Sequence, residues 1–304
     1  MNLGNENVII RKLTFIGILI FSSVFCRAQE NTGSVDDLEA LLDAETAEIT
    51  DFTTATFKST RILNGHSIER MQTGNLDFRI SHRFGSLNSG AYELFGLDQS
   101  ITHFSLEYGI TDWMMLGIGR GNYQKAFNGF LKYSVLRQSK GKKNMPISLS
   151  LLSSIEINTL ENNNLEENFN SRLTYTHQLL IARKFTDRFS FQLAPTYIHR
   201  NTVADSNFDN DIFAVGAGGR FKISNWVSVN AEYYYVINPD DFKSQDRCNV
   251  LSLGFDIETG GHVFQIVFSN SQFMTEKAFI AETSGNWGDG DIHFGFNISR
   301  VFDF

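Results

Sequence analysis

The stretch GDIHFGFNISRVFDF (290–304) alternates apolar and polar side chains with a period of two. A strand with one apolar face and one polar face gives this period, because successive side chains point to opposite sides of a sheet. The apolar set is Ile292, Phe294, Phe296, Ile298, Phe302 and Phe304, and the residues between them include His293, Gly295, Asn297, Ser299 and Asp303. The pattern predicts a strand over 291–304.

The same period recurs from residue 75 onward. It predicts further strands at 76–84, 102–110, 113–121, 126–137, 147–157, 172–185, 189–200, 212–223, 227–235, 251–258 and 262–270. Each is near the roughly ten residues that a tilted strand needs to cross a bilayer. The total is about twelve strands, with ten or fourteen as alternatives.

The connections between these strands are of two kinds that largely alternate. Tight turns are expected at Thr111-Asp112, Thr186-Asp187, Ser224-Asn225 and Gly260-Gly261, and long polar loops at 86–99, 159–171, 201–210, 239–248 and 271–290. Two connections break the alternation, the basic QSKGKKN (138–144) where a tight turn is due and the short GNYQ (121–124) where a long loop is due. Short turns at one rim and long loops at the other are typical of outer-membrane barrels.

The sequence therefore predicts an all-β protein, a closed antiparallel up-and-down transmembrane barrel. A soluble sandwich alternates in the same way, but the long strands and the aromatic residues at strand ends oppose it. No strand edge can stay open in lipid, so we expect the strand at 291–304 to pair with the one at 76–84. Phe302 and Phe304 also resemble the signal that outer-membrane assembly machinery reads.

The segment before the barrel is predicted to have two parts. Residues 1–28 have a basic region, a short apolar core and a small residue before Gln29, which is typical of a cleaved signal peptide; a lipoprotein anchor at Cys26 is the competing interpretation. Residues 29–74 form a polar segment with a short helix at 34–47, and the barrel spans 75–304. Because neither alternating set of residues 56–63 or 66–73 is apolar, this segment either plugs the lumen or lies beneath the barrel on the periplasmic side. Both interpretations stay open.

Composition limits the other classes of function. The formal net charge of −8 argues against nucleic-acid binding. Of the two cysteines, Cys26 lies in the predicted signal, so Cys248 has no partner for a disulfide. We predict no cofactor and no metal site, because no His/Cys/Asp cluster has ligand spacing.

A group of polar side chains is predicted to point inward near mid-height of the barrel. Its members are Arg79, Glu107, Lys132, Gln178, Glu232 and Asp256. They form either a selectivity constriction or a set of mutually paired side chains that fill the lumen. Glu232 and Asp256 are expected to be neighbours on adjacent strands.

Several stretches together resemble a known family: RILNGHSIE (61–69), ISHRFG (80–85), LEYGIT (106–111), QLLIARKF (178–185), AEYYYV (231–236), LGFDIETGGHVFQ (253–265) and GNWGDGDIHFGFNISRVF (285–302). The family is one of membrane-bound β-barrel proteins catalogued as a domain of unknown function. The resemblance implies a barrel in the bacterial outer membrane and supplies no substrate, cofactor or catalytic residue.

The leading functional prediction is a narrow passive channel for small polar solutes, monomeric and surrounded by membrane lipid. The alternative is a closed barrel that serves the cell envelope structurally or by binding through its long loops or N-terminal segment. A lipid hydrolase is the weakest alternative, and we predict no enzyme. His103 and Ser105 point inward, whereas His177 and His199 point toward lipid and no serine is expected beside them.

Overall fold

The computed structural model describes residues 49–161, 168–203, 209–237 and 246–304. The predicted signal peptide 1–28 and the predicted helix 34–47 lie outside these residues. The described residues from Ile49 to Phe304 belong to one compact unit. Among them, no helix is long and apolar enough to cross a membrane.

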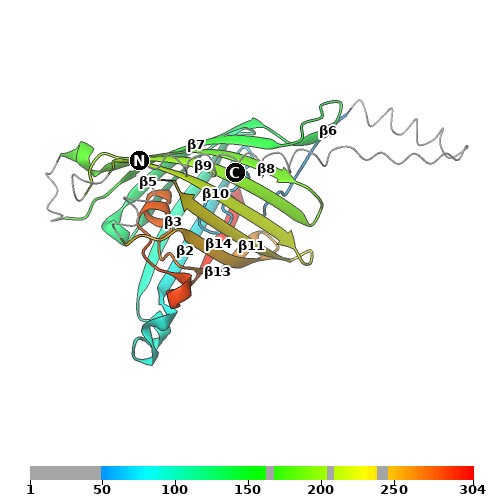
Figure 1. Ribbon diagram of the computed structural model, residues 1–304. Coiled ribbons are helices and arrows are strands. Elements are labelled where there is room, and N and C mark those ends of the chain that lie inside the picture. Colours follow the sequence, from blue (N-terminus) through cyan, green and yellow to red (C-terminus); the bar gives the residue numbers. More distant parts are fainter. Residues whose placement is uncertain (1–48, 162–167, 204–208, 238–245) are drawn as a thin grey trace, which may run out of the picture. The chain divides into compact units, whose positions relative to one another are not determined.

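Twelve strands of the described chain close into an antiparallel barrel, as predicted (Figure 1). They are β2 (Asn75–Ser86), β3 (Ser100–Thr111), β4 (Met114–Gly121), β5 (Phe127–Leu136), β7 (Ser148–Ile157), β8 (Leu173–Lys184), β9 (Phe189–Arg200), β10 (Asp211–Lys222), β11 (Val227–Val236), β12 (Val250–Thr259), β13 (His262–Ser269) and β14 (His293–Asp303). Each strand pairs with its neighbours in the chain, and β14 pairs with β2 from His293 opposite Ser86 to Asp303 opposite Asn75. The prediction that the last strand closes on the first is confirmed.

Short elements lie at the two rims of the barrel. We call the rim with the tight turns the turn rim and the opposite one the loop rim. At the turn rim, β1 (Thr50–Phe52) pairs with β6 (Ser139–Gly141), which lies in the basic connection between β5 and β7. The helix α4 (Glu276–Ala281) and the short 3-10 turns Leu87–Ser89, Ala91–Gly96, Tyr123–Lys125, Phe169–Arg172 and Trp287–Asp289 lie in connections at the loop rim.

Alternation along each strand separates the two faces as expected. On β7 the outward Leu151 is 50% exposed while its neighbour Ser150 is 0% exposed, and on β3 the outward Phe104 is 48% exposed while Ser105 is 3% exposed. An apolar outer face suits lipid, because a polar or charged side chain would lose its hydration in hydrocarbon.

The interior divides into an apolar part and a polar part. Inward residues on β8 to β12 are a mixture of polar and apolar side chains, and the apolar ones pack with two segments that enter the lumen. This cluster contains Leu180, Ala194, Ile198, Ile212, Ala214, Tyr234, Val236 and Val250 from the wall. The wall made by β14, β2, β3 and β5 carries buried Asn297, Asp77, Arg79, Arg83, Glu107 and Lys132. The interior is therefore filled, and its chemistry changes around the circumference.

The lipid-facing assignment predicts an uneven response to charge. Leu151→Arg, in the middle of β7, should lower the free energy of unfolding in a bilayer by about 2–4 kcal/mol, because a cation near the membrane midplane loses its hydration. Ile223→Arg, one residue beyond β10 at the turn rim, should cost only about 0–1 kcal/mol. Denaturant titration in vesicles measures both values, and equal losses at the two positions would contradict the placement of Leu151 near the membrane midplane and of Ile223 at the rim.

Candidate functional site

Residues 56–68 lie inside the barrel as a hairpin, which we call the inner hairpin. Its turn is ILNGH (62–66), in which the Ile62 N–H donates to the Gly65 carbonyl at 2.8 Å, and the Ser67 N–H donates to the Thr60 carbonyl at 2.9 Å. Arg61 and His66 form the bridge between the two arms. An Asn-Gly pair favours such a tight turn. A Cβ on Gly65 would meet the Tyr234 hydroxyl oxygen at 2.0 Å, so only glycine fits here.

Side chains of the barrel wall hold the backbone of this turn. The Glu232 carboxylate accepts the N–H groups of Asn64 at 2.8 Å and Gly65 at 3.1 Å. Gln265 and Asn297 each donate a side-chain N–H at 2.8 Å, to the carbonyls of Ile62 and Leu63 respectively. Backbone polar groups of a buried turn need partners, and here the wall supplies them.

A cluster of charged side chains surrounds Thr60 on the hairpin. The Thr60 hydroxyl donates to Glu107 at 2.5 Å, and Arg79 donates to the Thr60 hydroxyl at 2.8 Å. Lys132 donates to the carbonyls of Ser67 at 2.9 Å and Glu69 at 2.8 Å. Arg61 lies 3.4 Å from Glu107 between charged atoms. Lys132 also donates to the Thr60 carbonyl at 3.4 Å, so three wall charges meet at this residue of the hairpin.

Two wall glycines receive the apolar side chains of the hairpin turn. A Cβ on Gly218 would meet the Ile62 Cδ1 atom at 2.4 Å, with the next atoms at 3.6 Å or beyond. A Cβ on Gly254 would meet the Leu63 Cδ2 atom at 2.6 Å and the carbonyl oxygen of Ile266 at 2.4 Å. The missing side chains at both positions leave room for the hairpin.

A second segment enters the lumen from the loop rim. Residues 270–285, which we call the inner loop, connect β13 to β14 and contain α4, all six residues of which are buried. Lys277 lies 3.7 Å from Glu156 of the wall and 3.1 Å from Glu282 between charged atoms. Phe279 and Ile280 pack in the same apolar cluster as Phe57 and Ile62 of the hairpin.

The inner hairpin and the inner loop also touch through titratable groups. The His66 Nε2 atom lies 3.5 Å from a carboxylate oxygen of Glu276. Burial, followed by the nearby Arg61 charge, lowers the pKa of His66 well below its ordinary value, so this imidazole is neutral at pH 7. Burial raises the pKa of Glu276, against the opposing effect of Arg61. With a neutral imidazole, the contact is not an ion pair at pH 7.

The structure places all six predicted lumen residues on the inner face of the barrel, each with an exposed fraction of 3% or less; they are Arg79, Glu107, Lys132, Gln178, Glu232 and Asp256. It brings Arg79, Glu107 and Lys132 together around Thr60. Gln178 lies apart and donates to Thr196 at 2.9 Å, and Asp256 accepts from Gln265 at 2.8 Å. Their role as a constriction stays a prediction.

Two expectations about neighbouring strands are wrong. Glu232 lies opposite Ser252 on β12, while Asp256 lies opposite Ser228, so the two acids are not neighbours. His177 does have a serine beside it, because Ser153 on β7 lies opposite it with 2.9 Å between Ser153 Oγ and His177 Nδ1. A long loop connects β11 to β12, and another connects β7 to β8. A long loop does not fix which residues of the two strands lie opposite each other.

The Ser153–His177 pair does not form a catalytic site in the described part of the chain. A nucleophilic serine needs a base that is oriented by a third group, and His177 stacks on Tyr197 at 6.3 Å between ring centroids without an acidic partner. Each polar group instead satisfies the other on an apolar surface. In the described residues, no group of three or more His, Cys, Asp or Glu side chains is placed to bind a metal ion.

Sequence reasoning missed the amides and the arginine that hold the hairpin. Gln192 donates to the His66 carbonyl at 2.7 Å, and Arg83 donates to the Asn64 side-chain oxygen at 2.6 Å. The signal in the sequence is the set of inward side-chain amides on β9, β13 and β14. A wall that only had to be polar could use serine or threonine, so repeated amides indicate hydrogen bonds to another part of the chain. The Asn-Gly pair at 64–65 was the matching signal on the hairpin.

Comparison with known proteins gives one family match. A family described as a membrane bound beta barrel domain, of unknown function, matches residues 57–302. No curated protein matches the chain. The matched range begins at the start of the inner hairpin, so the match covers the hairpin together with the barrel.

Solved structures of membrane channels resemble the chain weakly. The NanC porin aligns with a TM-score of 0.47 at 10% identity over 75% of this chain and 99% of that one. The KdgM porin gives 0.42 at 9% identity over 76% and 99%, and an outer membrane channel from Pseudomonas putida F1 gives 0.45 at 12% identity over 77% and 98%. These values are too low to carry a functional conclusion to this chain.

The two inserted segments predict separable effects of two wall carboxylates. Glu232→Ala removes the carboxyl acceptor of two buried hairpin amides, which costs about 1–3 kcal/mol, so hydrogen exchange at Asn64 and Gly65 should accelerate by roughly tenfold. Glu156→Ala should accelerate exchange in 276–281 instead. Exchange measured by mass spectrometry checks both, and a uniform acceleration in both variants would show that the wall does not hold the segments individually.

Proposed function

Because the chain belongs to this family of membrane bound beta barrel domains, we propose that it is an outer-membrane channel for small polar solutes that its inner hairpin and inner loop hold closed. The observation that carries the proposal is the charged inner wall on β2, β3 and β5. A barrel of about twelve strands is wider than the eight-stranded barrels that their own side chains fill. Here the filling comes from segments outside the strands.

The contacts of the hairpin fit a removable closure. Arg79, Lys132 and Glu232 bind it through hydrogen bonds to hydroxyl and backbone groups. Water can replace each of these partners once the hairpin leaves, because charged groups on a wet lumen wall are well solvated. Withdrawal also exposes the apolar part of the wall that Phe57 and Ile62 cover, at a cost proportional to its area, and this cost keeps the closed state favoured.

The wall charges would then set the ion preference of the open lumen. Buried acids of the strands are Asp77, Glu107, Glu156, Glu232 and Asp256, and the buried bases are Arg79, Arg83, Lys132 and Arg220. The near balance of the two signs favours small polar or weakly charged solutes over strongly charged ones. Arg61 leaves with the hairpin, which shifts the open lumen toward cations.

A closed structural barrel is the second candidate, and the extent of the filling favours it. Residues 56–68 are almost all buried, and the pockets between them and the wall are small; one lined by Arg61, Asn64, Arg79 and Arg83 has a volume of about 10 Å³. In this case the loops at the loop rim would bind another component of the envelope. Both candidates share a monomeric barrel in the outer membrane, with Phe302 and Phe304 read by the assembly machinery.

Conductance across a planar bilayer separates the two candidates. Deletion of residues 29–74 should give steady conductance with a weak cation preference, whereas deletion of 29–48, which keeps β1 and the hairpin, should behave as the full chain. Since the larger deletion leaves wall charges without partners, Gly218→Leu is the second test, because it displaces only Ile62 and should produce brief openings. Folded, silent barrels in both the 29–74 deletion and Gly218→Leu would overturn the hairpin as the closure of a channel and favour the closed barrel.

The orientation in the membrane gives a further prediction. A peptide tag after Gly90, in the loop between β2 and β3, should be labelled on intact cells, because long loops of such barrels face outward. A tag between Gly260 and Gly261, in the turn between β12 and β13, should be labelled only after the outer membrane is opened. Both sites have open space around the glycine. Labelling of the second tag on intact cells would invert the topology.

A further inference from the structure

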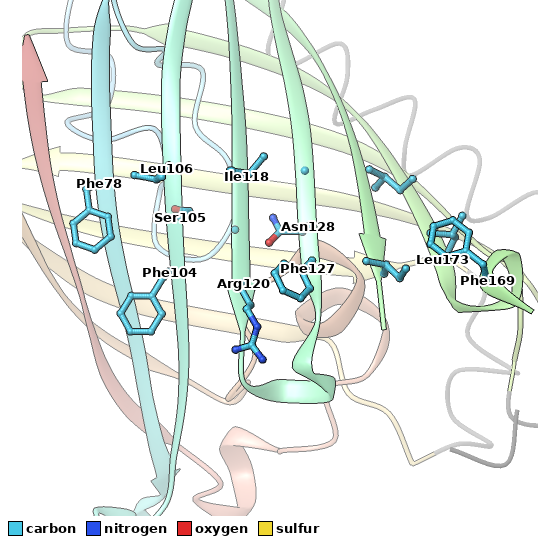
Figure 2. Close-up of a pocket in the computed structure, with 14 residues that line it drawn as sticks. Phe78, Phe104, Ser105, Leu106, Ile118, Arg120, Phe127, Asn128, Phe169 and Leu173 are labelled. Carbon is cyan, nitrogen blue, oxygen red and sulfur yellow. The ribbon is translucent and has the colours of Figure 1, made fainter. Parts of the chain in front are cut away.

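An apolar groove lies on the outer surface of the barrel near the loop rim (Figure 2). Its volume is about 570 Å³, and it crosses β3, β4, β5 and β7. The outward side chains that line it include Phe104, Ile118, Phe127, Ile155 and Phe169. It is separate from the filled lumen, and neither the family description nor the proposed channel assigns it a role.

The groove passes over one outward position on β5 that has no side chain. Gly129 lies between Ile118 on β4 and Ile155 on β7 in the register of the sheet. The other outward residues of β5 nearby, Phe127 and Leu131, are large and exposed. A Cβ on Gly129 would meet no atom closer than 3.8 Å, so the glycine is not required by backbone packing. Its effect is to leave a slot between larger side chains.

A single cation stands at the end of the groove nearest the loop rim. Arg120 is the next-to-last residue of β4 and points outward, between Phe104 on β3 and Phe127 on β5. Figure 2 shows its side chain between the two rings, and its guanidinium carbon lies 5.2 Å from the centre of the Phe127 ring. Among the described residues, no carboxylate forms an ion pair with Arg120.

We propose that this groove binds one acyl chain of a phosphate-bearing anionic lipid, with the lipid phosphate at Arg120. An unpaired cation on a lipid-facing surface is costly unless it reaches the polar interface or an anion. Arginine matches a phosphate in geometry and charge, and the slot over Gly129 matches a single hydrocarbon chain that continues toward the membrane centre. The inference rests on the membrane location in the proposed function but not on conduction.

Lipid binding to the full chain in detergent, measured by native mass spectrometry, tests the proposal with two probes. Palmitoyl-oleoyl phosphatidylglycerol carries the phosphate, and palmitoyl-oleoyl glycerol has the same chains without it. The full chain should bind one phosphatidylglycerol in preference to the neutral lipid. Arg120→Gln should remove that preference, roughly fivefold, and retain weak binding of both.

Filling the slot provides the second arm and has a matched control. Gly129→Leu should weaken binding of both lipids by roughly tenfold, because it occupies the space of the chain. Gly219→Leu is the control, since Gly219 also points outward, on β10, and a Cβ there would meet no atom closer than 3.8 Å. Heat-modifiable migration on a gel verifies that each barrel is folded.

The outcomes divide clearly. Loss of affinity in Gly129→Leu with unchanged affinity in Gly219→Leu supports the groove as the site. Equal binding in all variants, or equal losses in the two glycine variants, overturns it, because lipid would then coat the barrel without a specific position. If Arg120→Gln still prefers phosphatidylglycerol to the neutral lipid, the placement of the lipid phosphate at Arg120 is overturned. A barrel that never conducts but passes this test would refute the channel alone.

Discussion

The structure depends on the rule that a β-sheet in lipid can have no free edge. Hydrocarbon offers no partner to a backbone N–H or carbonyl group, so β14 must pair with β2 along its whole length. Closure at twelve strands then creates the second requirement. A cylinder of this size cannot be filled by inward side chains of ordinary length, so the remaining lumen must hold either water or other parts of the chain. The inner hairpin and the inner loop meet this requirement, and the wall side chains that bind them follow from it.

The fold could be predicted from the sequence because it repeats one local signal. Period-two alternation identifies both the strands and their faces, and tight turns such as Gly260-Gly261 fix the register of the strands they join. The same reasoning failed where long loops connect strands. The sequence predicts Asp256 beside Glu232 and no serine beside His177, and both predictions are wrong, because neither the 239–248 loop nor the 159–171 loop determines the offset of the strands that it joins.

The hairpin could not be positioned from the sequence for a different physical reason. Its residues show no apolar face, because they are bound through their backbone to the side chains of Glu232, Gln265 and Asn297. Every residue offers the same backbone N–H and carbonyl groups, apart from proline, so a segment that is bound through its backbone shows almost no characteristic pattern in its sequence. The pattern lies instead in the wall, as inward amides and as the glycines at 218 and 254 that accept Ile62 and Leu63. The six lumen residues were therefore identifiable as inward, while what they bind was not.

Each of the two inserted segments enters and leaves the barrel at the same rim. The inner hairpin is reached from β1 and returns to β2, so its two ends lie at the turn rim. The inner loop leaves β13 and returns to β14, so its two ends lie at the loop rim. Neither segment is threaded through the barrel from one rim to the other. Each segment can therefore move out of the lumen at its own rim without breaking any hydrogen bond between strands of the barrel.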